Sequence, residues 1–151
     1  MLLGELLIQK KLLTQEQLDS ALEEQKLSRD FLGSILVRRR FIREQDLLKV
    51  LSEQFHMPCI DLGTQPIDWK LAMRFTPSLV VDHQCLPIRQ DENGIVVAIT
   101  NPLDAQAISM AQEQAKGVPI RPALAAAAQL QDALKIYKEN VSARIKKLFS
   151  E

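Results

Sequence analysis

Glycine and glutamine recur at matched positions near the start of the chain, and both residue types offer groups that recognise a ligand. Gly4 recurs as Gly33, and Gln25 recurs as Gln54. A glycine in the first turn of a helix lets a partner approach the backbone closely, where free N–H groups attract an anion. A glutamine amide donates and accepts hydrogen bonds together, which suits the edge of a nucleobase. These recurrences predict binding of a ligand that has two equivalent halves.

Catalytic chemistry is not indicated by the residues. The chain has only two histidines, His56 and His83, and its five glycines are too few for a glycine-rich phosphate-binding loop. It contains no G-x-x-x-x-G-K-[ST], H-E-x-x-H or G-x-S-x-G motif. His56 and Cys59 have a metal-ligand spacing, but no second ligand pair accompanies them. We therefore expect a non-enzymatic domain with no cofactor and no metal.

Charge and hydropathy narrow the class of protein further. The 151 residues include 19 basic and 19 acidic side chains, so the formal net charge is zero. Neutrality argues against a general nucleic-acid coat and against a binder of anionic membranes. No apolar run approaches the roughly 18 residues that span a bilayer, and the first residues lack the features of a signal peptide. We expect a cytoplasmic protein that binds no DNA and does not insert directly into a membrane.

The recurring residues belong to a gapless tandem repeat. Residues 2–25 align with residues 31–54 at a shift of 29, and nearly all matched apolar positions stay apolar. Within each copy, apolar residues recur at steps of three and four, which predicts two short helices. Neither helix pair can bury its apolar stripe alone. We expect a four-helix unit over residues 1–62, and a packing unit that binds no ligand is the alternative.

Local signals mark where the second helix of each copy begins. Thr14 and Gln17 form a capping-box pattern in the first copy. Arg43 takes the Thr14 position in the second copy, so that helix needs a different cap. Glu44 and Asp46 still lie in its first turn, where acidic side chains favour the helix dipole.

Residues 63–151 have a different pattern, which predicts a small α+β subdomain with one sheet. Asp91-Glu92-Asn93-Gly94 is a hairpin turn signal, and Gly117 is a helix stop. The last segment predicts a long helix, whose apolar stripe runs from Leu130 to Leu148 and exceeds the length that the sheet needs. The expected elements are short helices around 69–74 and after 77, strands at 85–89, 95–100 and 118–124, and a helix at 103–116.

The two copies resemble the N-terminal MshEN domain of type II secretion and type IV pilus assembly ATPases. The family pattern is R-L-G-x-x-[LVI]-[LVI]-x-x-G-[LVI]-[LVI]-x4-L-x3-L-x2-Q, written twice with a five-residue spacer. The matching residues are Leu3, Gly4, Leu7, Ile8, Leu12, Leu13, Leu18, Leu22 and Gln25, and then Leu32, Gly33, Leu36, Val37, Ile42, Leu47, Leu51 and Gln54. The similarity continues to near Tyr137 and so covers about nine-tenths of the chain.

Members of this family bind cyclic di-GMP, one half of the ligand to each repeat. The resemblance therefore implies a regulatory domain of a secretion or pilus ATPase, recruited to the inner membrane through a partner. The residues that it implies for the ligand are Leu3, Gly4, Leu7, Gln25, Leu32, Gly33, Leu36 and Gln54, and we add Phe31 and Arg40, which lie outside the family pattern. A protein-docking adaptor that links the ATPase to its inner-membrane platform and ignores nucleotide is the alternative.

The chain departs from the family pattern at two equivalent positions in each copy, and the second copy also has Phe41 as a tolerated apolar substitute. Leu2 and Phe31 stand where the pattern has arginine, and Lys11 and Arg40 stand where it has its second glycine. An arginine offers fork-shaped, charge-assisted contacts to phosphate or guanine, which both copies lack. We expect Phe31 to stack on a base and Lys11 and Arg40 to supply charge from a new direction.

Four arginines between residues 38 and 43 form the strongest charge cluster. Arg38, Arg39, Arg40 and Arg43 are the nearest source of positive charge for the phosphates of a bound nucleotide. A solvated helix end is the simpler interpretation. A helix-turn-helix DNA reader is a third possibility, against which the net neutrality argues.

Overall fold

The computed structural model describes residues 2–149, and its contacts divide the chain into two compact units, Met1–His56 and Met57–Glu151. The unit of Met1–His56 (unit 1) holds the repeat, and the unit of Met57–Glu151 (unit 2) holds the sheet. Residues 57–62, which we expected in the repeat subdomain, hydrogen-bond into unit 2. Leu124 N donates to Pro58 O and Ile60 N donates to Leu124 O, both at 2.8 Å.

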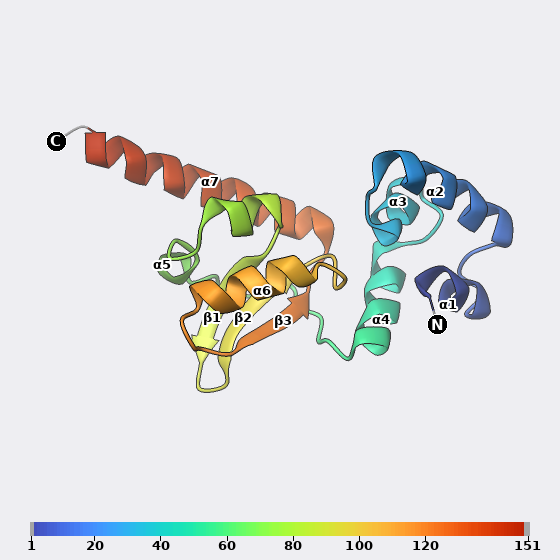
Figure 1. Cartoon of the computed structure of the whole chain (residues 1–151), viewed down its shortest axis with the longest axis horizontal. Helices are drawn as coiled ribbons and strands as arrows, with labels where there is room; N and C mark the ends of the chain where they lie inside the picture. The colour runs from blue at the N-terminus through green and yellow to red at the C-terminus, as the bar shows by residue number, and fades with distance from the viewer. Residues whose placement is uncertain (1, 150–151) are drawn as a thin grey trace. The chain divides into compact units, whose positions relative to one another are not determined.

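Unit 1 consists of two copies of a helix pair (Figure 1), as the apolar spacing predicts. Its helices are α1 (Leu3–Gln9), α2 (Gln15–Ser28), α3 (Leu32–Arg38) and α4 (Glu44–Phe55). The helices α1 and α3 have the same length, and α3 begins 29 residues after α1. Leu12 N donates to Leu7 O at 3.0 Å, and the equivalent Phe41 N donates to Leu36 O at 2.9 Å. The repeat in sequence is therefore a repeat in backbone geometry.

The turn after the first helix of each copy contains a left-handed residue. Lys11 and Arg40 both have φ of 62°. Their N–H groups donate to Ile8 O at 2.9 Å and to Val37 O at 3.0 Å. A side chain is unfavourable at positive φ, and glycine is the usual residue there. The geometry explains why the family pattern has glycine at this position.

The second helix of the first copy begins as predicted. Gln17 N donates to Thr14 Oγ1 at 3.2 Å, and Thr14 N donates to Gln17 Oε1 at 3.1 Å, which completes the capping box. Arg43 makes no side-chain cap to α4. Its Nε instead pairs with Asp46 Oδ2 at 3.0 Å.

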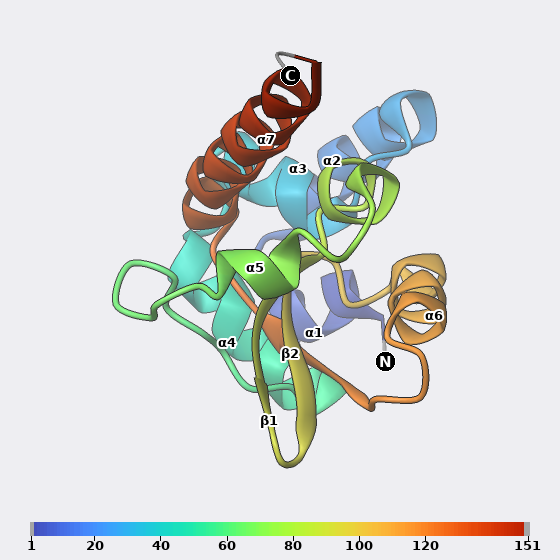
Figure 2. The ribbon, with the colours of Figure 1, turned by 90° about the vertical axis from the view of Figure 1, so that its left-hand side faces the viewer.

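The elements of unit 2 are α5 (Trp69–Ala72), the π-helical η1 (Ser78–Asp82), β1 (Leu86–Asp91), β2 (Gly94–Ile99), α6 (Ala105–Gln114), β3 (Ile120–Leu124) and α7 (Ala127–Phe149). The three strands form one sheet in the order β1-β2-β3, with β1 and β2 antiparallel and β2 and β3 parallel. The hairpin of β1 and β2 projects from the unit with its turn at the tip (Figure 2). The α5 helix packs against β1, and α6 packs against β3 and η1.

The predicted α+β architecture is thus confirmed: a helical repeat, then a hairpin, a helix, a strand and a long final helix. Gly94 begins β2 with φ of 129°, and a Cβ there would lie 2.3 Å from Pro119 O. Glycine is required at this position, because both the backbone angle and the neighbouring carbonyl exclude a side chain.

The α7 helix covers the core of unit 2 with only its first half. Leu130, Leu134 and Tyr137 are buried, and Tyr137 OH donates to Phe75 O at 2.9 Å. After Tyr137 the helix continues past the sheet as an exposed extension (Figure 1). Within the described residues, no helix combines the length and apolarity needed to cross a membrane.

Candidate functional site

Two ion pairs join the copies of the repeat, and they are equivalent to each other. Lys10 Nζ lies 3.1 Å from Glu53 Oε2, and Arg39 Nη1 lies 3.8 Å from Glu24 Oε1. The shift of 29 residues carries Lys10 onto Arg39 and Glu24 onto Glu53. Each copy therefore gives its base to the acid of the other copy.

Such reciprocity is the signature of a two-fold axis. In a two-fold arrangement, residue i of one copy meets residue j of the other, and residue j meets residue i. A repeat stacked by translation would make the contact in one direction only. These two ion pairs are the ones expected if an approximate half-turn relates the copies, although the helix packing is less reciprocal, because α2 packs on α3 more extensively than α1 packs on α4.

The two recurring glycines lie inside this unit. A Cβ on Gly4 would lie 2.6 Å from Leu18 Cδ1, and a Cβ on Gly33 would lie 3.0 Å from Leu47 Cδ2. Leu18 and Leu47 are equivalent positions on the second helix of each copy. Each glycine therefore allows its own helix pair to pack closely. The close approach that we expected from a ligand is made, on the side-chain face, by Leu18 at Gly4. At Gly33 it is made by Leu47 and by the ring of Phe31, whose Cε2 would lie 2.7 Å from the added Cβ.

The predicted apolar residues divide into an interior set and a surface set. Leu7 and Leu36 are 0% exposed and belong to the core of unit 1. Leu3, Phe31 and Leu32 are half-buried and reach the surface at the start of α1 and α3. In this conformation, only the surface set can touch a ligand.

The two glutamines occupy equivalent places near the ends of α2 and α4. Gln25 is half-buried, and its Nε2 donates to Asp30 O at 3.1 Å, which ties the helix to the spacer between the copies. Gln54 is also half-buried, with its Oε1 atom inside the unit. The second N–H and the Oε1 atom of the Gln25 amide are not used by this bond and could meet a ligand.

Most of the arginine cluster is already paired with acids. Arg38 bonds to Glu24 and to Asp30, and the hydrogen bond to Glu24 raises the pKa of its guanidinium. Arg39 pairs with Glu24 and places its guanidinium carbon 4.8 Å from the centre of the Phe41 ring.

Arg40 differs from its neighbours. It is exposed, and it makes no ion pair with any residue that the structure describes. Among residues 38–40, it therefore has the charge that is most available to an anion.

Sequence reasoning missed the residues that reveal the two-fold relation. The reciprocal pairs are formed by four charged residues that are not in the family pattern, namely Lys10, Glu24, Arg39 and Glu53. A signal existed, since the alignment places a base opposite a base and an acid opposite an acid at these positions. Among residues 2–149, no group of three or more His, Cys, Asp and Glu side chains is placed to hold a metal ion.

A family model described as the MshEN domain matches residues 55–141. The match lies almost wholly in unit 2, so it is independent of the tandem motif in unit 1. Two type IV pilus assembly ATPases named PilB are similar in sequence. The protein of Myxococcus xanthus is 28% identical over 106 residues, which is 70% of this chain and 19% of that protein.

The second PilB, from Thermus thermophilus, is 32% identical over 109 residues, or 71% of this chain and 12% of that protein. The chain thus matches less than a fifth of the length of these ATPases.

Two solved structures have a similar fold. A structure of MshE with cdg superposes with a TM-score of 0.76 at 26% identity, covering 91% of this chain and 99% of the other. A structure of the N-terminal domain of XpsE superposes with a TM-score of 0.69 at 19% identity, covering 87% and 90%. Both superpositions extend over most of the chain, repeat and sheet included.

Proposed function

Because the chain belongs to the MshEN domain family, we propose that its tandem repeat binds one molecule of cyclic di-GMP across the two copies. The reciprocal ion pairs Lys10–Glu53 and Arg39–Glu24 carry this proposal. They indicate an approximate two-fold axis, and cyclic di-GMP is itself two-fold symmetric, with one guanine and one phosphate in each half. The similar MshE structure was solved with cdg, which we take to be the same nucleotide.

The half-exposed residues would make the contacts. Leu3 and Leu32 supply equivalent apolar surfaces, and the ring of Phe31 offers a face on which a base can stack. Gln25 and Gln54 would read the edges of the two guanines.

Of the remaining predicted residues, one would contact a phosphate and the others lie in the interior of unit 1. Arg40 would supply charge to a phosphate. Gly4, Gly33, Leu7 and Leu36 act from the interior, because their packing fixes the helices on which the contact residues lie.

Regulation would act through the spacer between the copies. Gln25 donates to the carbonyl of Asp30, so a nucleotide bonded to the same amide would be coupled to the conformation of the spacer. A ligand that favours one arrangement of the spacer shifts the population of the domain toward it. We propose a non-catalytic regulatory role of this kind in a cytoplasmic pilus or secretion ATPase, or beside one.

A nucleotide-independent docking adaptor is the second candidate, and two observations favour it. Leu2, at the position of the first motif arginine, is a 72% exposed apolar side chain. Arg38, Arg39 and Arg43 are paired with acids inside the repeat. In this case unit 1 would link an ATPase to its inner-membrane platform through protein contacts alone.

Isothermal titration of the chain with cyclic di-GMP separates the two functions. We expect saturable binding that Gln25→Ala and Gln54→Ala each weaken by about three- to tenfold, as expected for loss of one hydrogen bond. Gln45→Ala is the control, because Gln45 is an exposed glutamine on the same helix as Gln54. No heat at micromolar protein and excess ligand would favour the adaptor, and binding that ignores both glutamines would refute the site.

A further inference from the structure

The end of α7 presents an apolar stripe that no other described residue of unit 2 covers. The stripe begins with Leu130 and Tyr137, which are buried, and continues at the same helical spacing. Beyond the core it consists of Ile145, Leu148 and Phe149, which are 48%, 70% and 87% exposed. Packing within unit 2 therefore accounts for the first half of the stripe and leaves the second half unexplained.

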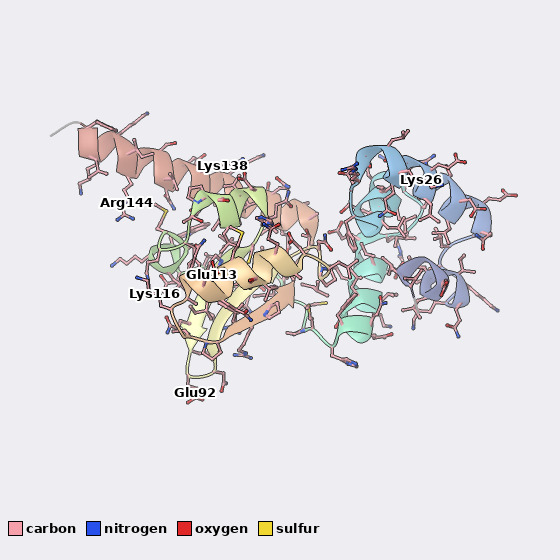
Figure 3. All side chains as sticks on the ribbon, viewed as in Figure 1. Lys26, Glu92, Glu113, Lys116, Lys138 and Arg144 are labelled. Atoms are coloured by element: carbon pink, nitrogen blue, oxygen red, sulfur yellow. The ribbon has the colours of Figure 1, made fainter. Side chains whose placement is uncertain are left out.

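Basic side chains surround this exposed stripe. Residues 140–149 contain Arg144, Lys146 and Lys147 and no acidic residue, although the whole chain is neutral. At 100° per residue, Arg144 and Lys146 lie on opposite sides of Ile145, so the stripe has a cation on each flank. Figure 3 shows Arg144 extending outward from α7.

We propose that the C-terminal end of α7, residues 141–149, binds the surface of an anionic lipid bilayer. Apolar side chains with flanking cations suit the boundary between headgroups and acyl chains, where long basic side chains reach back to lipid phosphates. The mode is peripheral, since the described residues contain no helix that could span a bilayer.

The packing of unit 2 limits how deep the helix can lie. The same stripe is covered by the core of the unit as far as Tyr137, so α7 cannot lie flat on a membrane along its whole length. The last turns extend past the sheet (Figure 1) and can dip into the interface with Leu148 and Phe149 leading. A second copy of the chain is a poorer occupant, because it would bring a second set of three cations against the first.

Vesicle co-sedimentation of the full chain tests the proposal. We expect binding to vesicles of phosphatidylglycerol and phosphatidylcholine, weak binding to phosphatidylcholine alone, and loss of binding at high salt. Lys146→Gln should lower the partition coefficient about fivefold, and Leu148→Ser with Phe149→Ser should abolish sedimentation. Lys26→Gln and Leu103→Ser are matched controls at an exposed lysine and a 61% exposed leucine elsewhere.

Three results would overturn the proposal. The first is that the chain does not sediment with anionic vesicles, and the second is that the double serine variant still sediments with them. The third is that sedimentation velocity shows a dimer of the original chain and a monomer of the double variant. The last result would identify a second copy as the occupant. Both serines replace exposed side chains, so thermal unfolding should match that of the original chain and confirm that the variants fold.

Discussion

Single residues in unit 1 hold the turns of the repeat at some cost in stability. Lys11 and Arg40 share φ of 62°, where an L side chain costs about 1–2 kcal/mol. Both side chains are basic and exposed. The chain thus has two equivalent cations at positions where the family pattern has the less strained glycine, which fits a use for charge beside the proposed nucleotide.

The strain at Lys11 can be measured directly. We expect Lys11→Gly to be more stable than Lys11→Ala by about 1 kcal/mol, because alanine keeps the Cβ that is unfavourable at positive φ. Urea unfolding of the two variants gives the difference. Lys49, an exposed lysine within α4, provides the opposite control, since glycine there should be less stable than alanine by about 1 kcal/mol. Equal stability of the two Lys11 variants would contradict the strained turn.

Because the thiol of Cys85 is buried, we expect the folded chain to lose stability at alkaline pH. Burial, reinforced by the negative charge of Asp104, raises the pKa of this thiol from 9.0 to about 12. A raised pKa contributes stability that is complete below pH 9 and is lost as the pH rises toward 12, because the unfolded thiol ionises first. The free energy of unfolding should fall by about 1.4 kcal/mol per pH unit through this group.

Denaturant unfolding between pH 8 and pH 11 measures that slope. Cys85→Ala should reduce it, while a smaller slope remains from Tyr137, whose pKa burial also raises. Cys59→Ala is the control, because Cys59 is exposed. An unchanged slope in the Cys85 variant would show that the thiol does not carry the effect.

At the scale of elements, the two helix pairs differ chiefly in how their second helices begin. The α2 helix has a complete capping box at Thr14, whereas Arg43 leaves α4 without a side-chain cap. An N-cap hydroxyl satisfies a backbone N–H that otherwise lacks a partner in the helix. The second copy lacks this stabilising hydrogen bond, so a hydroxyl at position 43 should make it more stable.

Cap exchange between the copies should therefore change stability in opposite directions. Thr14→Ala should destabilise the chain by about 1 kcal/mol, and Arg43→Thr should stabilise it by about 0.5–1 kcal/mol despite losing an exposed ion pair with Asp46. Thermal unfolding followed by circular dichroism at 222 nm reports both shifts. A lower midpoint for Arg43→Thr would show that the ion pair matters more than the cap.

Elements with local signals were predictable from the sequence, and those fixed by distant contacts were not. The capping box at Thr14 and the turn before Gly94 each depend on residues close in sequence, and both formed as predicted. Segment 58–60 pairs with β3 through hydrogen bonds to a residue more than 60 positions away, which no local pattern indicates.

The role of the recurring glycines was ambiguous for a different reason. A missing side chain permits approach by a ligand or by a neighbouring helix, and the sequence alone does not distinguish them. At Gly4 the close neighbour is a leucine of the same copy, and at Gly33 the close neighbours are Phe31 and Leu47 of the same copy. The candidate site was therefore only partly predictable. The sequence indicated the repeat and a ligand with two equivalent halves, whereas only the packing in the structure distinguishes interior residues from surface residues that a ligand could contact.

At the scale of the whole molecule, the net charge has to be considered separately for each unit. A net charge of zero argues against anionic partners when it is averaged over 151 residues. The structure separates that average into an arginine cluster in unit 1, of which Arg38, Arg39 and Arg43 pair with acids, and a group of three basic residues near the end of α7 in unit 2. Recognition of the nucleotide and of a lipid surface would thus belong to different units.

A repeat with two matched half-sites should bind one two-fold ligand. Parallel calorimetric titrations of the chain with cyclic di-GMP and with GMP test this expectation. We expect one cyclic di-GMP per chain, and two weaker sites for GMP with at least about a hundredfold lower affinity, because linking the halves makes the second contact intramolecular. A single GMP site of comparable affinity, or no heat from cyclic di-GMP, would contradict this expectation.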